Sequence, residues 1–284
     1  KLETLKAAMA CGVPIPKTYF VNSLEDIRSI ADTIEYPVVV KARNKTSWKD
    51  GRPSMLKVTS KNYVENFTEL FEIASEILQK SGKMPLIQEY IPGKGYGVEV
   101  LFRKGEPRAL FMHKRLHEYP ITGGASTLRE GIYMQDLRDF AFSLMKEMKW
   151  NGVAMVEFKR DDRDGTPKLI EVNGRFWGSL PLALVSGVDF PYLLHTMVTE
   201  GDVTPIFDYD LGVKCRWLLP GDILWFFSSL KERDDKYTVM KDFFKFNGCY
   251  DDIISISDLG PSIGAFRVIM HQFGDVIRGR RRLS

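Results

Sequence analysis

The sequence has few of the residues from which disulfide frameworks and zinc sites are built. Its 284 residues include three cysteines and four histidines. Cys11, Cys215 and Cys249 lie far apart, without C-x-x-C or Cys/His spacing, so we expect neither a disulfide scaffold nor a zinc site. Sparse unpaired cysteine is typical of a reducing compartment, and we therefore expect a cytoplasmic protein.

Long apolar runs and a large excess of one charge are also lacking. No apolar run approaches the roughly 18 residues that a membrane helix needs, and no signal peptide is visible, although the chain begins at Lys1 without a methionine. The formal net charge is only +3, too small to require a polyanionic partner. We expect neither a membrane nor a nucleic acid as partner. The basic run at 278–282 is interpreted as a solvated tail, with a phosphate-rich partner as the alternative.

Apolar residues, in contrast, are present in ordinary amount. At 44% they suffice for one or two globular cores. Helical periodicity and capping residues predict helices at 2–11, 23–33, 62–80 and 134–149. Apolar and alternating runs predict strands at 36–42, 85–90, 97–103, 107–112, 152–160 and 168–172. Residues 43–55 are expected to form a mobile loop, and beyond residue 200 the pattern is weak. Hairpins outnumber β-α-β alternation, which favours an α+β fold.

A row of polar side chains follows the last predicted strand. In "LIEVNGR", residues 169–175, Glu171, Asn173 and Arg175 occupy alternate positions and so share one face. If residues 153–172 form a hairpin centred near Asp164, Glu157 lies opposite Glu171, with Cβ atoms about 5 Å apart. A divalent cation would relieve the repulsion between these carboxylates, Asn173 would add a neutral oxygen, and such oxygen ligands suit Mg²⁺ or Mn²⁺. Arg175 could hold a phosphoryl group or an oxyanion. The alternative is a solvent-facing charged strand.

Two further features, a lysine at a strand end and a broken strand, indicate nucleotide binding only weakly when each is taken alone. Lys41 ends the buried strand "PVVVK", where its side chain either reaches water or offers a point charge to phosphate. In "LIQEYIPGKGYGVEVLF", residues 86–102, an apolar strand is broken at Pro92-Gly93 and Gly95. Backbone groups freed there could bond a flat heterocycle, or the break could be an ordinary hairpin connection. A protein kinase also has a strand lysine, but no HRD or DFG motif is present.

Together these segments resemble the ATP-grasp superfamily. "K…GVPIP" (Lys1, then 12–16), "YPVVVKA", "QEYIPG" and "GVAMVEF…LIEVNGR" occur in that family's order over roughly residues 1–200. "MHKRLHEYPITGGAST" and "NGRFWGSLPLALVSGVDFP" are most similar to predicted carboxylate–amine ligases related to the carbamoyl-phosphate synthase large subunit. The resemblance implies two α+β subdomains that grip ATP: residues 1–86 with a mobile lid, and 87–200 with the Mg/ATP site. It leaves 201–284 as a mixed extension of unknown role. Relatives usually carry a Rossmann-like domain before the position of Lys1, which we expect to be absent.

The resemblance also implies a role for each matching residue. Lys1 and Lys41 would contact ATP phosphates, and Gln88, Glu89, Tyr90 and Ile91 would form the hinge that receives adenine. Glu89 would accept from the exocyclic amine, and the backbone of Tyr90 and Ile91 would pair with the ring. Ile170 would lie under the base, although strict alternation turns it away from Glu171. The metal ligands would be Glu157, Glu171 and Asn173. Arg175, Lys114 and Arg115 would contact the γ-phosphate or an acyl phosphate. His113 and His117 are expected at the surface, without a catalytic role.

Three departures from the family pattern limit the transfer of these residue roles to this sequence. The segment after Lys41 is not a glycine-rich lid and retains only Gly51, so the charges of Arg43, Lys45, Lys49 and Arg52 would replace backbone amides. The position of a ribose-binding carboxylate falls near Lys94-Gly95. Trp177 and Ser179 stand where biotin carboxylases have Gln and Glu, which argues against bicarbonate chemistry.

The sequence therefore predicts an ATP-dependent ligase that joins a small-molecule carboxylate to an amine, or to a thiol, through an acyl phosphate, with ATP and Mg²⁺ (or Mn²⁺) bound. Two alternatives stay open at this stage: a non-catalytic ATP-binding regulatory module and a metal-dependent hydrolase. The oligomeric state is also open, with a homodimer among the possibilities. Arg216, Asp251 and Asp252 could line an acceptor pocket, but a surface position is favoured for them.

Overall fold

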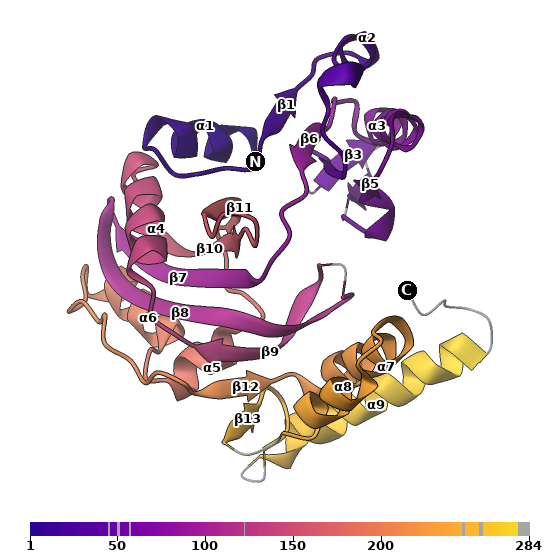
Figure 1. The fold of residues 1–284 in the computed structure, drawn as a ribbon. Coiled ribbons are helices and arrows are strands. Elements are labelled where there is room, and N and C mark those ends of the chain that lie inside the picture. The colour runs from indigo at the N-terminus through magenta and orange to yellow at the C-terminus, as the bar shows by residue number, and fades with distance from the viewer. Residues whose placement is uncertain are drawn as a thin grey trace. The chain divides into compact units, whose positions relative to one another are not determined.

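The chain forms two compact units that share its length in alternating pieces. The computed structural model describes residues 1–44, 46–49, 52–56, 58–121, 123–245, 248–255 and 258–277. Unit 1 comprises Lys1–Gly95, Asp136–Trp150 and Val156–Val172, and unit 2 comprises Tyr96–Gln135, Asn151–Met155 and Asn173–Ser284. Both units combine helices with antiparallel strands, as Figure 1 shows. The α+β class predicted from the sequence is confirmed.

Unit 1 contains a four-stranded sheet with the order β1-β6-β2-β5. Its strands are β1 (Thr18–Phe20), β6 (Leu86–Glu89), β2 (Val38–Lys41) and β5 (Tyr63–Val64). Neighbouring strands run antiparallel, and Lys41 is paired with Leu86 at the end of β2. The apolar run of β2 is buried, so only its last residue, Lys41, carries a charge out of the sheet. The pairing with β6 thereby fixes the position of the Lys41 backbone.

A capped amphipathic helix covers this sheet. In α3 (Phe67–Ser81), Leu70, Ala74 and Ile77 recur at the helical period and are buried with the β2 valines in one core. The Asn66 side chain accepts from the Glu69 N–H and begins the helix, and Gly82 ends it at φ +66°. The predicted helix 62–80 therefore exists, but its first turn is wrong, because Tyr63 and Val64 form β5.

The remaining elements of unit 1 are short. The helices are α1 (Leu2–Ala10), α2 (Leu24–Ser29) and α4 (Gln135–Glu147), and 3₁₀ turns cover η1 (Ala31–Thr33) and η2 (Ser60–Asn62). Ser23 caps α2 as predicted, through the Asp26 N–H. The segment 43–55, predicted to be a loop, contains the antiparallel hairpin β3 (Thr46–Lys49) and β4 (Arg52–Met55). Lys45 and Gly51 lie outside the described residues, as do the side chains of Lys49 and Arg52.

Unit 2 is built on a larger sheet. Its strands are β7 (Gly95–Arg103), β8 (Glu106–Tyr119), β9 (Ala125–Gly131), β12 (Lys214–Arg216) and β13 (Cys249–Asp251), adjacent in this order. The strand β10 (Gly152–Arg160) is the neighbour of β11 (Pro167–Asn173) in the sheet order. The helices α5 (Leu180–Val185) and α6 (Phe190–Thr199) share a core with Leu101, Phe111 and Met155. The turn predicted at Lys104-Gly105 is present, with both residues at positive φ.

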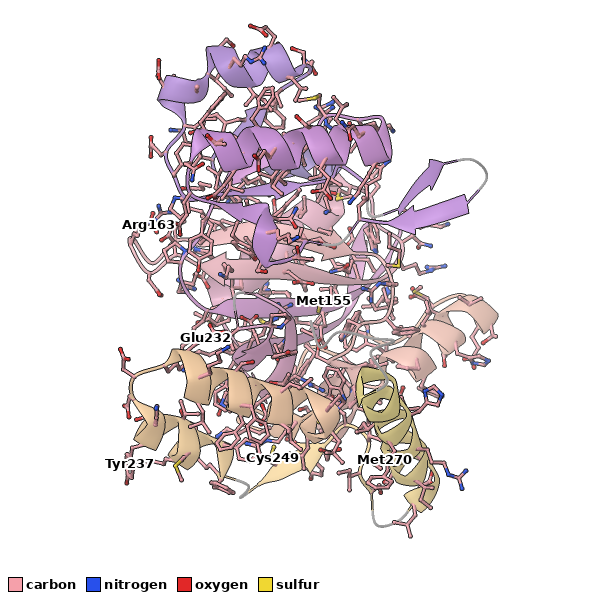
Figure 2. All side chains as sticks on the ribbon, turned by 90° about the vertical axis from the view of Figure 1, so that its right-hand side faces the viewer. Met155, Arg163, Glu232, Tyr237, Cys249 and Met270 are labelled. Carbon is pink, nitrogen blue, oxygen red and sulfur yellow. The ribbon has the colours of Figure 1, made fainter. Side chains whose placement is uncertain are left out.

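The C-terminal part of unit 2 is more ordered than its sequence pattern indicated. It contains η3 (Leu218–Asp222), α7 (Ile223–Glu232), α8 (Lys236–Phe243) and α9 (Leu259–Ile277). Large apolar side chains on these helices face solvent, among them Tyr237 on α8 and Met270 on α9 (Figure 2). The three cysteines are free, as expected. Over the described part of the chain, no helix is long and apolar enough to cross a membrane.

Candidate functional site

Four charged side chains of unit 1 influence the protonation of a fifth, Lys41, at the end of β2. Burial, together with the charges of Lys1 and Lys159, lowers the pKa of Lys41 to about 8, although the carboxylates of Glu171 and Glu157 raise it. We call these five residues the Lys41 cluster. Four of them were predicted from the sequence as phosphate or metal contacts, and the structure brings those four into one electrostatic environment. Lys159 is the member that sequence reasoning missed.

The β10–β11 hairpin carries three members of this cluster, and its turn corrects the predicted register. The Asp161 N–H donates to the Thr166 carbonyl at 3.0 Å, and the Gly165 N–H donates to the Asp161 carbonyl at 2.8 Å. Asp161 is therefore opposite Thr166, one residue away from the symmetric pairing around Asp164, which was wrong at the turn. The carboxylates of both glutamates nevertheless raise the pKa of the same lysine, Lys41.

The oxygen donors along this hairpin fit a hard divalent cation. Glu157 and Glu171 are half-buried, and Asn173 follows Glu171 by two positions on β11 and is buried. Two carboxylates and a carboxamide oxygen are ligands of the kind that Mg²⁺ takes, with water or phosphate oxygens completing the shell. No group of three or more His, Cys, Asp or Glu side chains that could hold a metal occurs within the described residues. A metal in that part of the chain would therefore depend on ligands beyond the side chains of these four residue types.

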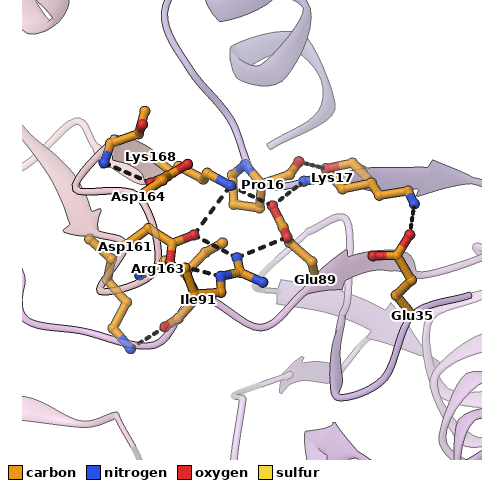
Figure 3. Close-up of polar contacts among 12 residues, drawn as sticks. Pro16, Lys17, Glu35, Glu89, Ile91, Asp161, Arg163, Asp164 and Lys168 are labelled. Carbon is orange, nitrogen blue, oxygen red and sulfur yellow. Dashed lines mark hydrogen bonds and ion pairs between the residues drawn. The ribbon is translucent and has the colours of Figure 1, made fainter.

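The predicted hinge continues from β6, and its side chains are tied into the fold. Gln88 is buried, and its Nε2 donates to Thr18 Oγ1 at 3.0 Å. The Glu89 carboxylate accepts from the Lys17 N–H at 2.8 Å, from Lys168 Nζ at 3.0 Å and from Arg163 at 3.1 Å (Figure 3). The Tyr90 N–H donates to the Pro37 carbonyl at 3.1 Å. The backbone of Tyr90 was predicted to pair with the adenine ring. Its N–H is already used by Pro37, so the Tyr90 N–H does not pair with a base in this conformation.

Two acidic residues, Glu89 and Asp161, form ion pairs with two basic residues, Arg163 and Lys168, and so connect the hinge to the β10–β11 turn. Asp161 is 1% exposed and accepts from Arg163 Nε at 2.8 Å, while Lys168 Nζ lies 3.3 Å from its other oxygen (Figure 3). The Arg163 guanidinium holds the pKa of Asp161 well below its usual range. Burial would raise the pKa of Glu89, but the Lys17 N–H, Lys168 and Arg163 outweigh it, and the net shift is downward. Residues 161–168 therefore fasten the hinge electrostatically.

Lys159 contacts the last hinge residue directly. Its Nζ donates to the Ile91 carbonyl at 2.9 Å and lies 5.0 Å from the centroid of the Tyr90 ring. Lys159 follows Glu157 by two positions on β10, so both side chains project from the same face of the strand. That alternation was the signal by which the sequence could have identified it.

A cavity of about 470 Å³ lies beside Lys1 in unit 1. Its charged lining is mainly basic, and carboxamide side chains add further donors. The lining residues are Lys1, Leu2, Glu3, Asn22, Arg43, Asn44, Lys83 and Met84. Arg43 is fixed there by a 2.7 Å bond to the Val21 carbonyl.

The three predicted phosphate or acyl-phosphate contacts belong to unit 2. Arg175 is exposed and donates to the Phe176 carbonyl at 2.7 Å. On β8, Arg115 donates to Glu118 at 3.1 Å, and Lys114 is paired with Tyr96 on β7 and Glu130 on β9. The predicted grouping of Arg175, Lys114 and Arg115 with the Lys41 cluster stays a prediction, as does the position of Ile170 under a base.

The two histidines expected at the surface are buried, which corrects that prediction. His113 is 1% exposed, and its Nδ1 lies 3.0 Å from Glu99 Oε1, which also accepts from Ser179 Oγ at 2.7 Å. The His113 ring packs against β7 where residue 97 is glycine, since a Cβ there would lie 2.3 Å from His113 Cε1. The histidine is therefore buried beside the Glu99 carboxylate on the neighbouring strand β7. Ser179 and Trp177, the positions at which biotin carboxylases differ, are both buried.

A second buried polar group fixes the C-terminal part of unit 2. Asp222 is fully buried, 2.8 Å from His117 Nδ1, 2.8 Å from Thr127 Oγ1 and 3.1 Å from Arg216 Nε. The ring of Trp225 stacks on His117 with centroids 3.3 Å apart. Arg216 is 2% exposed, so its predicted surface position was wrong.

The two acidic residues grouped with Arg216 in the sequence also serve the fold of unit 2. Asp251 accepts from the Ile254 N–H at 2.7 Å, and Asp252 forms an ion pair with the buried Arg129. Both carboxylates had been expected to be surface charges, but each has a partner in the fold of unit 2.

Known proteins resemble this chain over most of its length. Residues 81–218 match the family "ATP-grasp in the biosynthetic pathway with Ter operon". The carbamoyl phosphate synthase large chain of Pyrococcus furiosus is 25% identical over 201 residues, which are 68% of this chain and 18% of that protein.

Two solved structures show the same fold at low sequence identity. One is the biotin carboxylase domain of Hydrogenobacter thermophilus 2-oxoglutarate carboxylase, in complex with MgADP, ADP and bicarbonate. Its TM-score is 0.56 at 18% identity, over 74% of this chain and 47% of that one. The other is an L-amino acid ligase from Bacillus licheniformis, with a TM-score of 0.52 at 19% identity, over 72% and 50%. The chain thus spans half or less of each protein compared. The family match over residues 81–218 and the fold shared with these solved structures both point to similarity with ATP-grasp proteins.

Proposed function

We propose that this chain binds MgATP at the Lys41 cluster and uses it to activate a carboxylate for ligation to an amine. The observation that carries the proposal is the effect of both Glu157 and Glu171 on Lys41. Two carboxylates would suit a divalent metal, and a lysine beside them would suit phosphate oxygens. The biotin carboxylase domain was solved with MgADP, which supports nucleotide and magnesium as ligands of this fold.

In this proposal, Glu157, Glu171 and Asn173 hold the cation, and Lys1 and Lys41 hold phosphate oxygens. Bound magnesium would neutralise charge that develops on the phosphates. A substrate carboxylate oxygen attacks the γ-phosphorus, and ADP leaves with the electrons of the broken P–O bond. An amine then attacks the acyl carbon, phosphate leaves, and the amine loses a proton. The protein supplies position and charge, and no covalent nucleophile of its own.

One solved relative and the burial of two side chains support ligation of a substrate carboxylate to an amine rather than the use of bicarbonate. The L-amino acid ligase shares the fold, and its name describes ligation of amino acids. Ser179 is 7% exposed and donates to Glu99 at 2.7 Å, while Trp177 is packed in the core of unit 2. Side chains held in this way are poorly suited to bind bicarbonate at the positions where biotin carboxylases use Gln and Glu.

The test compares Glu171→Gln with Glu147→Gln, a matched change at an exposed position of α4. MgATP binding is measured by calorimetry with and without magnesium, and ADP release is screened over carboxylates paired with amines. We expect wild type and Glu147→Gln to bind MgATP and to release ADP with one such pair. Glu171→Gln should lose on the order of 10²–10⁴ in rate.

The screen separates the competing functions. MgATP binding with no ADP release under any pair of substrates would favour a regulatory module. ATP binding that is indifferent to magnesium, or near-normal turnover by Glu171→Gln, would contradict the assignment of the metal ligands.

A further inference from the structure

The cavity beside Lys1 lies at one end of the four-stranded sheet of unit 1. Strands β1, β6 and β2 are in register there, in a row of paired residues that consists of Phe20, Leu86 and Lys41. Three lining residues are each two positions beyond this row: Asn22, Met84 and Arg43. The sheet therefore sets the positions of the segments that form the cavity.

Positive charge is in excess around this cavity. Lys1, Arg43 and Lys83 line it, and the acidic residue among the lining residues is Glu3. Glu3 forms an ion pair with Lys6 at 3.2 Å, so its charge is shared with a further cation. The lining is therefore suited to an anion.

Arg43 is the donor that the fold leaves most incompletely satisfied. Its Nη2 donates to the Val21 carbonyl at 2.7 Å, which holds the guanidinium in place. Its Nε is buried, and within the described part of the chain no acceptor bonds it. An unpaired buried donor is costly, and the planar guanidinium matches the paired oxygens of a carboxylate or phosphate. An anion beside Arg43 would offset this cost.

We propose that this cavity binds a small organic dianion, either a dicarboxylate or a phosphate monoester. The inference is independent of the proposed function. The volume of about 470 Å³ falls in the range of about 300–1,000 Å³ that is usual for small-molecule sites, so an inorganic ion alone would leave most of it empty. Several cations suit more than one anionic group, and the side chains of Leu2 and Met84 offer apolar contact to the carbon atoms between them.

The phosphate tail of a nucleotide is a competing source of the same anionic chemistry. Lys1 lines the cavity and is also a member of the Lys41 cluster, so the two sites are neighbours. The cavity, however, lies at the start of β6, next to Met84, whereas the predicted hinge follows the end of that strand at Glu89. This placement favours a ligand separate from the nucleotide, and MgATP should then not displace it.

The experiment measures dissociation constants of succinate and glycerol 3-phosphate by calorimetry at constant ionic strength, with neutral succinamide and glycerol as controls. Wild type should bind at least one of the two dianions, with and without MgATP, and neither neutral compound. Arg43→Met should weaken this binding about 10- to 100-fold, the factor for a lost charge-assisted hydrogen bond. Lys83→Met, at an exposed lysine, should weaken it about 2- to 10-fold. The matched control Lys146→Met, on the exposed face of α4, should equal wild type.

Three results would overturn the inference. Wild type could bind neither dianion, or both Arg43→Met and Lys83→Met could bind them as tightly as wild type. Displacement of the dianion by MgATP would instead make the cavity part of the nucleotide site. Because the dianions are titrated without nucleotide, this site and the proposed function can fail independently. A circular dichroism melt of each variant confirms that the affinities refer to folded protein.

Discussion

Lys41 is the residue at which fold and proposed chemistry meet most directly. Burial is the main reason that its pKa falls to about 8, and the neighbouring cations Lys1 and Lys159 add to the shift. A lysine in this state is mostly protonated at pH 7 and mostly neutral at pH 9. Bound phosphate would favour the charged form and would raise the pKa of Lys41 in the complex.

The shift in the pKa of Lys41 on binding determines how the affinity for MgATP changes with pH. Because the pKa of Lys41 is higher in the complex, affinity for MgATP should be fully present below pH 8 and should weaken as pH rises toward the pKa of the complex. Binding near pH 8.5 should also take up a proton, detectable by calorimetry in buffers of different ionisation enthalpy. Lys41→Met should lose about 10- to 100-fold in affinity at pH 7 and show no proton uptake from this site. A constant affinity from pH 7 to 9 in wild type would contradict this.

Residues whose role depends on strand alternation were the most predictable from sequence. Glu157 and Glu171 were singled out because each follows an apolar run at a fixed spacing, and both influence Lys41; their role as metal ligands stays a prediction. His113 and Arg216 were misplaced because their burial depends on partners distant in the chain: Glu99 with Ser179, and Asp222. No local pattern reveals that a buried carboxylate will meet them.

At the scale of elements, the start of α3 shows what local chemistry decides. Asn66 accepts from the Glu69 N–H, and the Glu69 carboxylate accepts in return from Asn66 Nδ2 at 2.8 Å and from the Glu65 N–H at 3.0 Å. This reciprocal arrangement satisfies donors that a helix leaves open at its first turn. The Asn-x-x-Glu spacing is legible in the sequence, yet apolar periodicity alone placed the helix start five residues too early.

Removal of this cap should destabilise unit 1. Asn66→Ala should lower the free energy of unfolding by about 1 kcal/mol, the usual value of an N-cap side chain. Asn66→Ser, which retains an acceptor oxygen, should recover most of it. Urea unfolding followed by circular dichroism provides the measurement. An unfolding midpoint of Asn66→Ala equal to that of wild type would mean that the Asn66 side chain does not stabilise α3.

Other elements escaped prediction because their sequences lack a clear period. The β3–β4 hairpin is polar and basic, so neither alternation nor a buried run marks its strands. Beyond residue 200, the helices α7, α8 and α9 expose many large apolar side chains. The apolar residues are therefore not confined to one face, so the apolar periodicity of the sequence does not predict these helices. Caps and turns such as Ser23, Gly82 and Lys104-Gly105 were predicted because they need only local residues.

At the scale of the whole molecule, the α+β class and the similarity to ATP-grasp proteins were predictable, and the interleaving of the two compact units was not. The sequence suggested boundaries at 86 and 200, whereas the compact units exchange segments at 95, 135, 150, 155 and 172. Such interleaving arises from contacts between distant segments, for example the bond from the Leu169 N–H to the Pro14 carbonyl at 2.8 Å. The three-part division proposed from the sequence stays a prediction about function.

The acid stability of unit 1 should depend on the charges that join its distant segments. Against the opposing effect of burial, Glu89 on β6 and Asp161 at the hairpin turn both have lowered pKa values in the folded chain: Arg163 and Lys168 lower both, and the backbone N–H of Lys17 also lowers that of Glu89. A carboxyl whose folded pKa is depressed stabilises the fold above its unfolded pKa, near 4, and loses that contribution as pH falls through the folded value. Urea midpoints should therefore be steady from pH 7 to 5 and should fall below about pH 4.

Asp161→Asn tests whether this network is the cause. It removes one of the depressed carboxyls, so it should be less stable than wild type at pH 7, yet lose less on going from pH 5 to pH 3. Asp139→Asn, an exposed site on α4, is the matched control and should follow the wild-type curve. Because Arg163 is half-exposed, salt should weaken the stabilising contribution of Asp161 at pH 7. Parallel curves for wild type and Asp161→Asn would show that the acid sensitivity of this protein lies elsewhere.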